Sequence, residues 1–406
     1  MARIEFPVEL QKKIEESGPV DLIVGITGVA DTEELRTKVA CLRGMAEKTV
    51  VAYAGTAETE SSASPVEGVQ FAAYPMPASA SSLEFWLDIA AAQRSILALA
   101  AAWQARACLV VHNDLAALDA ESVSLFTGPV LQGKNDLVMP AYPDGKYDGL
   151  INKSLLAPLS RALYGRRVRS PLPFDFCAGV NAIGKFANDE SARAQNEPRL
   201  LWPANAVAMN GGQIGQATVN IQHATQTGGL DLSTVLAELA GSLFQEAETY
   251  AAYWQRVRGS QPVSRYGNPL IPEEDAQPVD SRPLIESFVL GSLNLEEVWR
   301  LVLPPATMLE LKRLTRLDAE QFRMPDALWA RIIYDFTLAH RMRRVSRTHV
   351  LGALTPLYLG WVASYTQEVG GATAQEADQR IEQLARAYEE QKPYFVSRWR
   401  WPERVS

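Results

Sequence analysis

The residues best suited for chemistry follow an apolar strand in the first third of the chain. The segment CLVVHND, residues 108–114, ends in His112, Asn113 and Asp114. Polar groups just past the carboxyl end of a buried strand lie where α/β sheets bind their ligands. A carboxylate there can hold a divalent cation that neutralises an anionic leaving group, and the imidazole and amide can ligate or hydrogen-bond. The alternative is that Asp114 only caps the following segment, residues 115–123.

Short strands and helices alternate around these residues. Apolar runs predict strands at 21–26, 49–55, 69–74, 108–114, 137–142 and 217–224, and the longest helix between them covers about 81–103. This alternation predicts an α/β fold, with a mainly parallel sheet covered by helices on both faces. The carboxyl ends of parallel strands share one edge. We therefore expect ligands near seven strand-end residues: Thr27, Gly28, Gly55, His112, Asn113, Asp114 and Tyr142. Of these, Gly28, Gly55, His112 and Asn113 are expected to contact a cofactor.

The rest of the chain is predicted to be mainly helical. One helix is expected at 232–257, and the Pro-rich segment 258–284 follows it. Helical spacing then continues through 286–302, 306–323, 326–343, 347–366 and 374–391. We expect a sheet domain over 1–257, a linker over 258–284 and a helical domain over 285–406.

Composition excludes several classes of function. The formal net charge of -8 argues against a chain devoted to nucleic acid. The three cysteines, Cys41, Cys108 and Cys177, fit neither a disulfide framework nor a zinc site. The N-terminal residues contain no apolar signal-peptide core, and the most apolar window, 89–103, is too short and polar to span a bilayer. The sequence therefore predicts a cytoplasmic protein without a membrane span.

Residues 139–176 contain the most specific pattern in the chain. The pattern comprises the run Lys146-Tyr-Asp-Gly149, then Asn152, then Arg161-Ala-Leu-Tyr-Gly165, a basic turn and the pair Asp175-Phe176. It is similar to a family of retaining GT-A glycosyltransferases that includes glucosyl-3-phosphoglycerate synthase and mannosylglycerate synthase. The resemblance continues through residues 242–267 and the helical tail, so it covers most of the chain from residue 108 onward.

The resemblance implies transfer of a hexose from a nucleoside-diphosphate sugar to a small anionic acceptor of the glycerate type, with retention. It implies that Asp114 and His223 hold Mg²⁺ or Mn²⁺, and that Asp175 lies near the donor sugar as a catalytic residue. Asp148 is the second catalytic residue that it implies. The acceptor side would be formed by Lys146, Asp148, Gly149, Asn152 and Arg161. Relatives in this family also suggest a homo-oligomer.

Five positions at the ligand edge depart from the family pattern. His112 stands where the first acid of the Asp-x-Asp motif is expected, and the turns after the first two strands lack their usual polar residues. Pro173 and Phe174 replace a Gly-Gly pair, and an apolar residue replaces the acid ahead of Trp202. Losing one such group commonly costs about 10²–10³ in rate. The alternative hypothesis is therefore a catalytically inactive relative that acts as a scaffold or regulatory partner.

Two patterns could suggest a dehydrogenase instead. Gly25 and Gly28 follow the first strand, and Tyr142 and Lys146 have the Tyr-x-x-x-Lys spacing. The full Gly-x-Gly-x-x-Gly pattern is absent, however, and a proline and a glycine at 143 and 145 break the helical turn that such a Tyr–Lys pair needs. The sequence therefore argues against this class.

Overall fold

The structure is a computed structural model that describes residues 6–28, 32–55, 68–75, 85–187, 199–223, 231–269 and 279–402. The chain divides into two compact units. The first, called the sheet unit, consists of Met1–Pro143, Val168–Gly228 and Pro262–Leu270. The second, called the helical unit, consists of Asp144–Arg167, Gly229–Gln261 and Ile271–Ser406.

The described part of the sheet unit contains one mixed sheet with the strand order β3-β2-β1-β4-β6-β5-β7-β8. The strands are β1 Leu22–Ile26, β2 Thr49–Ala54, β3 Val69–Tyr74, β4 Ala107–Val111, β5 Leu137–Ala141, β6 Phe176–Gly179, β7 Ile214–Thr218 and β8 Ser264–Tyr266. Strand β6 runs antiparallel to β4 and β5, and all other neighbouring pairs are parallel. The carboxyl ends of β1, β2, β4, β5 and β7 therefore lie at one edge, called the ligand edge, together with the amino end of β6.

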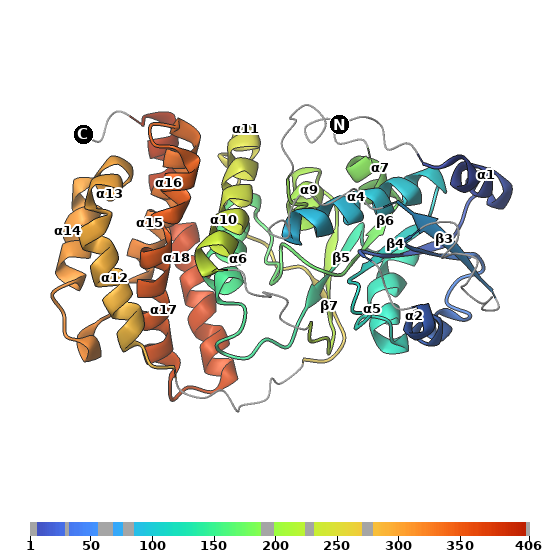
Figure 1. Cartoon of the computed structure of the whole chain (residues 1–406), viewed down its shortest axis with the longest axis horizontal. Coiled ribbons are helices and arrows are strands. Elements are labelled where there is room, and N and C mark those ends of the chain that lie inside the picture. Colours follow the sequence, from blue (N-terminus) through green and yellow to red (C-terminus); the bar gives the residue numbers. More distant parts are fainter. Residues whose placement is uncertain are drawn as a thin grey trace. The chain divides into compact units, whose positions relative to one another are not determined.

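Helices cover both faces of this sheet (Figure 1). The helices α4 Phe85–Ala102, α7 Val180–Ala187 and α9 Pro203–Met209 lie on one face, and α2 Thr32–Val39 and α5 Ala120–Leu131 lie on the other. The short helix α1, Val8–Ser17, contacts β3 through a hydrogen bond from Lys13 to the Phe71 carbonyl. The predicted α/β class and mainly parallel sheet are confirmed.

Helix α4 packs closely on the centre of the sheet. A Cβ atom on Gly25 would lie 2.1 Å from the Ile96 side chain, so only glycine allows α4 to approach β1 this closely. By length and composition α4 could cross a membrane, with a mean hydropathy of 1.3. Half of its apolar window is buried against the protein, however, which is typical of a core helix in an α/β fold. The first residues predicted for this helix, 81–84, lie outside the described residues.

The helical unit consists mainly of packed helices from three separate segments of the chain. Its elements are a π-helical segment Asn152–Leu156, α6 Ala157–Tyr164, α10 Leu232–Thr249, α11 Ala251–Trp254, α12 Arg282–Asn294, α13 Glu296–Val302, α14 Pro305–Leu314, a 3-10 turn Ala319–Gln321, α15 Asp326–Met342, α16 Arg347–Gly352, α17 Thr355–Val369 and α18 Ala374–Arg400. The helical C-terminal region predicted from sequence is therefore confirmed. Four of the predicted helices are each interrupted within their predicted ranges: 232–257, 286–302, 306–323 and 347–366.

The boundary between the units differs from the predicted linker at 258–284. Residues 144–167 and 229–261 belong to the helical unit, because C-terminal helices bind their backbone. Trp329 Nε1 and Tyr388 Oη both donate to the Ser154 carbonyl, at 2.9 and 2.8 Å. Lys392 Nζ donates to the carbonyls of Ala162 and Val257. Helical periodicity marks which face of a helix is buried but not against which partner, so the sequence alone could not place this boundary.

Candidate functional site

The site at the ligand edge begins where strand β4 ends. His112, Asn113 and Asp114 follow Val111 directly, and Val110 is paired with Phe176 in the antiparallel strand β6. This register places Asp175 beside the end of β4. The backbone N–H of His112 donates to Asp175 Oδ1 at 2.9 Å, which joins the two strand ends at the centre of the sheet.

His223 approaches the same place from the segment that follows β7. Its Nδ1 atom lies 2.9 Å from Asp114 Oδ2, and its Nε2 atom lies 2.7 Å from Asp175 Oδ2. His112 Nδ1 also lies 3.2 Å from Asp114 Oδ2. The structure thus brings together four of the residues predicted from sequence, although their roles in binding or catalysis stay predictions.

The charges of this cluster compensate one another. Burial of His223 acts to lower its pKa, but hydrogen bonds to Asp114 and Asp175 raise that pKa to about 9. Burial of Asp114 acts to raise its pKa, but hydrogen bonds from His112, His223 and the Ala116 N–H hold it well below its usual range. In this arrangement His223 is a charged imidazolium, since only that form offers an N–H to both carboxylates.

Three side chains of the cluster have the donor types of a divalent metal site. His112, Asp114 and His223 each offer one ligand atom, and these atoms lie within 4.8 Å of one another. Ligand atoms at about 2.1 Å from a shared ion lie at most about 4.2 Å apart. The three side chains would therefore need to move only slightly closer together to bind one ion. Two imidazoles and one carboxylate suit Mn²⁺ better than Mg²⁺, which prefers oxygen ligands.

Tyr142, directly after β5, belongs to the site, whereas the sequence named it only as a strand-end residue without a role in binding or catalysis. Its hydroxyl donates to Asp175 Oδ2 at 2.9 Å, and its ring lies 5.3 Å from the His223 ring. Asp175 is fully buried. Its carboxylate is hydrogen-bonded to the His112 N–H, the Tyr142 hydroxyl and His223 Nε2. The signal for Tyr142 was its position at a strand end, the same signal that identified His112.

Phe174 is the second residue that sequence reasoning did not assign to the site. Its ring lies 4.8 Å from the His112 ring and 4.9 Å from the His223 ring, and it stacks on Trp86 at 4.8 Å. The sequence identified Phe174 only as a departure from a Gly-Gly pair. In the structure the Phe174 ring lies directly against two of the candidate metal ligands, His112 and His223.

The strand-end glycines and Asn113 lie at the same ligand edge. The Gly28 carbonyl accepts a hydrogen bond from Ala54 N, and Gly55 N donates to the Tyr74 carbonyl. A Cβ atom on Gly28 would lie 3.0 Å from the Asn113 Cβ atom. The Asn113 Oδ1 atom is buried and has no hydrogen-bond partner among the described residues, which is expected of a group that receives a ligand. Residues 29–31 and 56–67 of the two turns lie outside the described residues.

The residues predicted for the acceptor side belong to the helical unit. Lys146 Nζ donates to the carbonyls of Val369, Gly370 and Ala372 at the end of α17. Asp148 is exposed and accepts a hydrogen bond from Gly145 N, and Gly149 has a left-handed φ of +59°. Asn152 begins the π-helical segment. Their roles toward an acceptor stay predictions.

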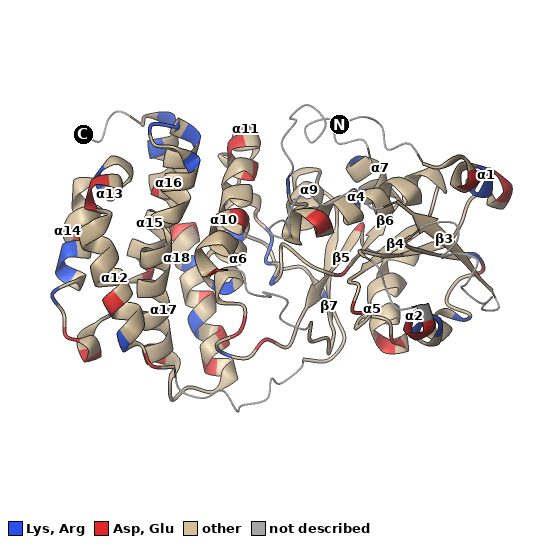
Figure 2. Ribbon diagram, in the orientation of Figure 1, with Lys and Arg blue, Asp and Glu red and all other residues tan. Residues whose placement is uncertain are grey.

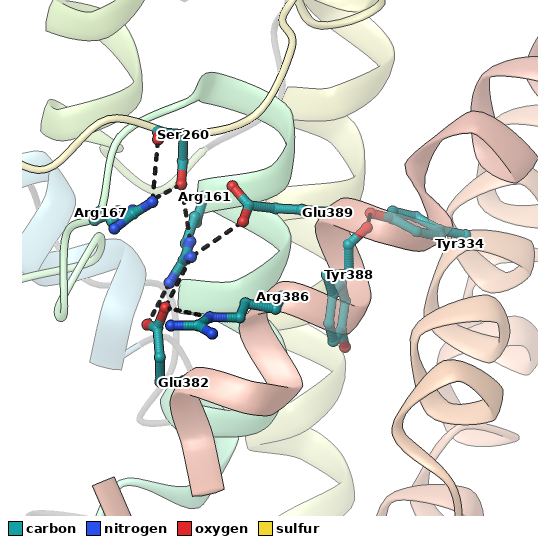
Figure 3. A network of polar contacts seen from close by, with 8 residues as sticks. All are labelled: Arg161, Arg167, Ser260, Tyr334, Glu382, Arg386, Tyr388 and Glu389. Carbon is teal, nitrogen blue, oxygen red and sulfur yellow. Dashed lines mark hydrogen bonds and ion pairs between the residues drawn. The ribbon is translucent and has the colours of Figure 1, made fainter. Parts of the chain in front are cut away.

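Arg161 is bound by carboxylates of α18 (Figure 3). Its Nη1 donates to Glu382 Oε2 at 2.5 Å, its Nη2 donates to Glu389 Oε2 at 3.0 Å, and its Nε donates to Ser260 Oγ at 3.0 Å. The side chain is buried, at 6% exposure. An anionic acceptor would have to displace these partners, so the geometry favours a structural role for Arg161 within the helical unit.

Comparisons with known proteins identify similar structures but no family. Scans of family models and of curated proteins found no match. Glucosyl-3-phosphoglycerate synthase from Mycobacterium tuberculosis in complex with UDP has a TM-score of 0.34 and 14% identity, covering 61% of this chain and 85% of that chain. Its complex with Mn²⁺, UDP-glucose and phosphoglyceric acid gives the same two values, covering 64% and 93%. Similarity at this level assigns no activity to the present chain.

Proposed function

We propose that this chain transfers a hexose from a nucleoside-diphosphate sugar to a small anionic acceptor of the glycerate type, with retention and with a divalent metal. The observation that carries the proposal is the contact between Asp114 and His223 at the ligand edge. The sequence pattern had assigned these two residues to one metal site from a resemblance, without any information on their distance. The pattern Lys146-Tyr-Asp-Gly and the Asp175-Phe176 pair support the same family.

In this proposal Asp114, His223 and His112 hold the ion, with Mn²⁺ favoured by the two imidazoles. A divalent cation bound there would neutralise the charge that develops on the departing diphosphate. Asp175 orients His223 through Nε2 and is itself oriented by Tyr142. Such partners fix the ring of a metal-binding histidine and increase its basicity.

The remaining roles follow the resemblance. Gly28, Gly55 and Asn113 would contact the nucleotide, and the buried Asn113 Oδ1 atom supports this assignment. Asp148, Gly149, Asn152 and Lys146 would contribute to the acceptor side. Arg161 is left out of that set because Glu382 and Glu389 already bind its guanidinium.

Thermal unfolding tests the proposal with UDP-glucose or GDP-glucose in the presence of Mn²⁺. A ligand at about 100 times its Kd adds about 2.7 kcal/mol to the free energy of unfolding, so the melting temperature should rise. Asp114→Asn and His223→Ala should each remove the rise. Glu121→Gln removes one exposed carboxylate from α5 and is the matched control, which should keep the rise.

The alternative is a catalytically inactive relative that binds a protein partner. One observation favours it: both ring nitrogens of His223 are already occupied by carboxylates, and Phe174 packs against the cluster. This alternative predicts no metal-dependent shift with either nucleotide sugar at millimolar concentration. It also predicts no hexose transfer to glycerate or 3-phosphoglycerate, which a product assay would detect directly.

A further inference from the structure

The helical unit contains a cavity that shares no residue with the site at the ligand edge. The cavity has a volume of about 460 Å³ and lies among the end of α13, the start of α14 and the ends of α15 and α18. Its charged lining residues are Arg300, Arg344, Arg398 and Asp335, and we call it the arginine cavity. The volume falls within the range of small-molecule sites.

Asp335 and Arg398 are the buried charged residues of the arginine cavity. Arg398 Nε lies 3.2 Å from Asp335 Oδ1, and the two side chains are 12% and 1% exposed. The Tyr394 hydroxyl lies 2.9 Å from both carboxylate oxygens of Asp335. Arg398 Nη1 is buried and has no acceptor among the described residues. A buried guanidinium N–H without an acceptor indicates a place for a ligand oxygen.

The charge of the cavity is opposite to that of the whole chain. The chain carries a formal net charge of -8, whereas three arginines and one aspartate line the cavity. Arg300 also donates to Glu296 Oε1 at 2.7 Å, in a pair whose arginine side chain is 62% exposed, so a ligand there would compete with this surface carboxylate. Figure 2 shows Lys and Arg gathered at this end of the helical unit, where α18 ends. Burial raises the pKa of Asp335 to about 7, although Arg398 and Tyr394 oppose this shift. Near neutral pH the aspartate therefore offsets only part of the arginine charge.

The first turn of α14 adds to this positive potential. Pro304 and Pro305 line the cavity at the amino end of the ten-residue helix, and no side chain caps that end. The amino end of a helix carries a partial positive charge. This effect supplements the guanidinium groups, which are the principal anion-binding groups of the cavity.

We propose that the arginine cavity binds a small organic phosphate that also carries hydroxyl groups. Guanidinium groups pair with phosphate oxygens in bidentate fashion, and three of them match the charge and the three free oxygens of a phosphate monoester better than those of one carboxylate. Asp335 provides an acceptor for a ligand hydroxyl. The proposal goes beyond the proposed transfer reaction and does not depend on it.

Isothermal titration calorimetry of the full chain with glycerol 3-phosphate tests this inference. Saturable binding is expected, and glycerol alone should give none. The double variant Arg300→Gln, Arg344→Gln should weaken binding roughly tenfold or more, because hydrogen bonds to a charged group are strong. Both side chains are exposed at the cavity mouth, so the fold should tolerate the change. Arg313→Gln on the exposed side of α14 is the matched control and should bind as the wild type does.

Two further measurements separate this cavity from the ligand edge. Asp114→Asn should bind glycerol 3-phosphate unchanged, and loss of binding in that variant would place the ligand at the ligand edge and overturn the proposal. Glycerate should bind more weakly than glycerol 3-phosphate, and equal or tighter binding would overturn the assignment to phosphate. Absence of glycerol 3-phosphate binding, or equal binding in the double variant, would also overturn it.

Discussion

His223 Nδ1 lies 2.9 Å from Asp114 Oδ2, although 109 positions separate the two residues in the chain. The contact joins the end of a central strand to the segment that follows β7, and Asp175 completes the bridge on the other ring nitrogen. A proton and a metal ion compete for the same imidazole nitrogen, so this cluster can act as a structural ion pair or as a metal site. The predictions below distinguish these roles.

Asp175→Asn tests whether Asp175 positions His223. Asparagine keeps the shape but cannot accept hydrogen bonds from the His112 N–H, Tyr142 and His223 as a carboxylate does. We expect the affinity for Mn²⁺ to fall about 10–100-fold, as for other partners of metal-binding histidines. The free energy of unfolding should fall by about 1–3 kcal/mol.

Calorimetry with Mn²⁺ and urea unfolding measure these two effects on Asp175→Asn. Glu121→Gln, which also removes one negative charge from the sheet unit, should change neither value. A variant with normal Mn²⁺ affinity and reduced stability would show that Asp175 only supports the fold.

Phe174→Ala tests whether this ring restricts the candidate site. The ring lies within 5 Å of the rings of both His112 and His223, where the family pattern has glycine. Its removal opens space for a donor, so the affinity for UDP-glucose with Mn²⁺ should rise. Loss of the stacking on Trp86 should lower the free energy of unfolding by about 1–3 kcal/mol, less than for a fully buried phenylalanine.

The nucleotide affinity of Phe174→Ala is measured by calorimetry, with Phe71→Ala as a control that also removes a phenylalanine from the sheet unit. Phe71 lies on β3 and packs against Tyr53. Strands β2 and β1 separate β3 from β4, the strand that precedes His112, so Phe71 lies away from the candidate site. It should lose stability without gaining affinity. A decrease in affinity for Phe174→Ala would contradict the prediction and would instead make Phe174 a contact for the ligand.

Arg161→Met tests the structural role of the buried guanidinium. Methionine leaves Glu382 and Glu389 without their main cation, and breaking such a partly buried pair should cost about 2–4 kcal/mol in the free energy of unfolding. Arg386→Met removes only an exposed partner of Glu382 and should cost less than about 1 kcal/mol. If Arg161 bound the acceptor, its conservative variant Arg161→Lys would raise KM for the acceptor while leaving stability nearly unchanged.

The positions of most strands, and of the polar residues that follow them, could be predicted because they depend on local sequence patterns. Apolar runs located five of the strands, and the position after a strand identified His112, Asn113 and Asp114. Strands β6 and β8 were not predicted because their four and three residues are too short to show a period. The strand predicted at 217–224 is β7, Ile214–Thr218, earlier in the chain, and residue 224 lies outside the described residues.

Contacts between residues that are far apart in the sequence could not be predicted from such patterns. Nothing local in the sequence indicates that Arg161 pairs with α18, since a basic residue at the end of a helix is equally compatible with an exposed or a paired position. The same holds for Tyr142, whose partner Asp175 directly precedes β6, a strand that sequence reasoning missed. Assigning Asp114 and His223 to one site required the resemblance, because no periodic signal relates residues so far apart.

The last prediction concerns acid stability and the buried residue His340 in α15. Burial, together with the nearby Arg347 and Arg343, lowers the pKa of His340 to about 4, and its ring packs against Phe244. An unfolded histidine has a pKa of about 6.5, so between these two values the unfolded state binds more protons than the folded state. The free energy of unfolding should therefore fall as the pH decreases from about 6.5 to about 4, with a contribution of about 2–3 kcal/mol from His340.

Urea unfolding at pH 7 and pH 5 measures this contribution as the difference between the wild type and His340→Gln. Glutamine cannot titrate, so the variant should lose less stability than the wild type over this range. His349→Gln replaces an exposed histidine nearby in the helical unit and should keep the pH dependence of the wild type. An equal loss of stability in the wild type and His340→Gln would assign the acid sensitivity to the carboxylates instead, because protonation of paired carboxylates also destabilises a folded chain at low pH.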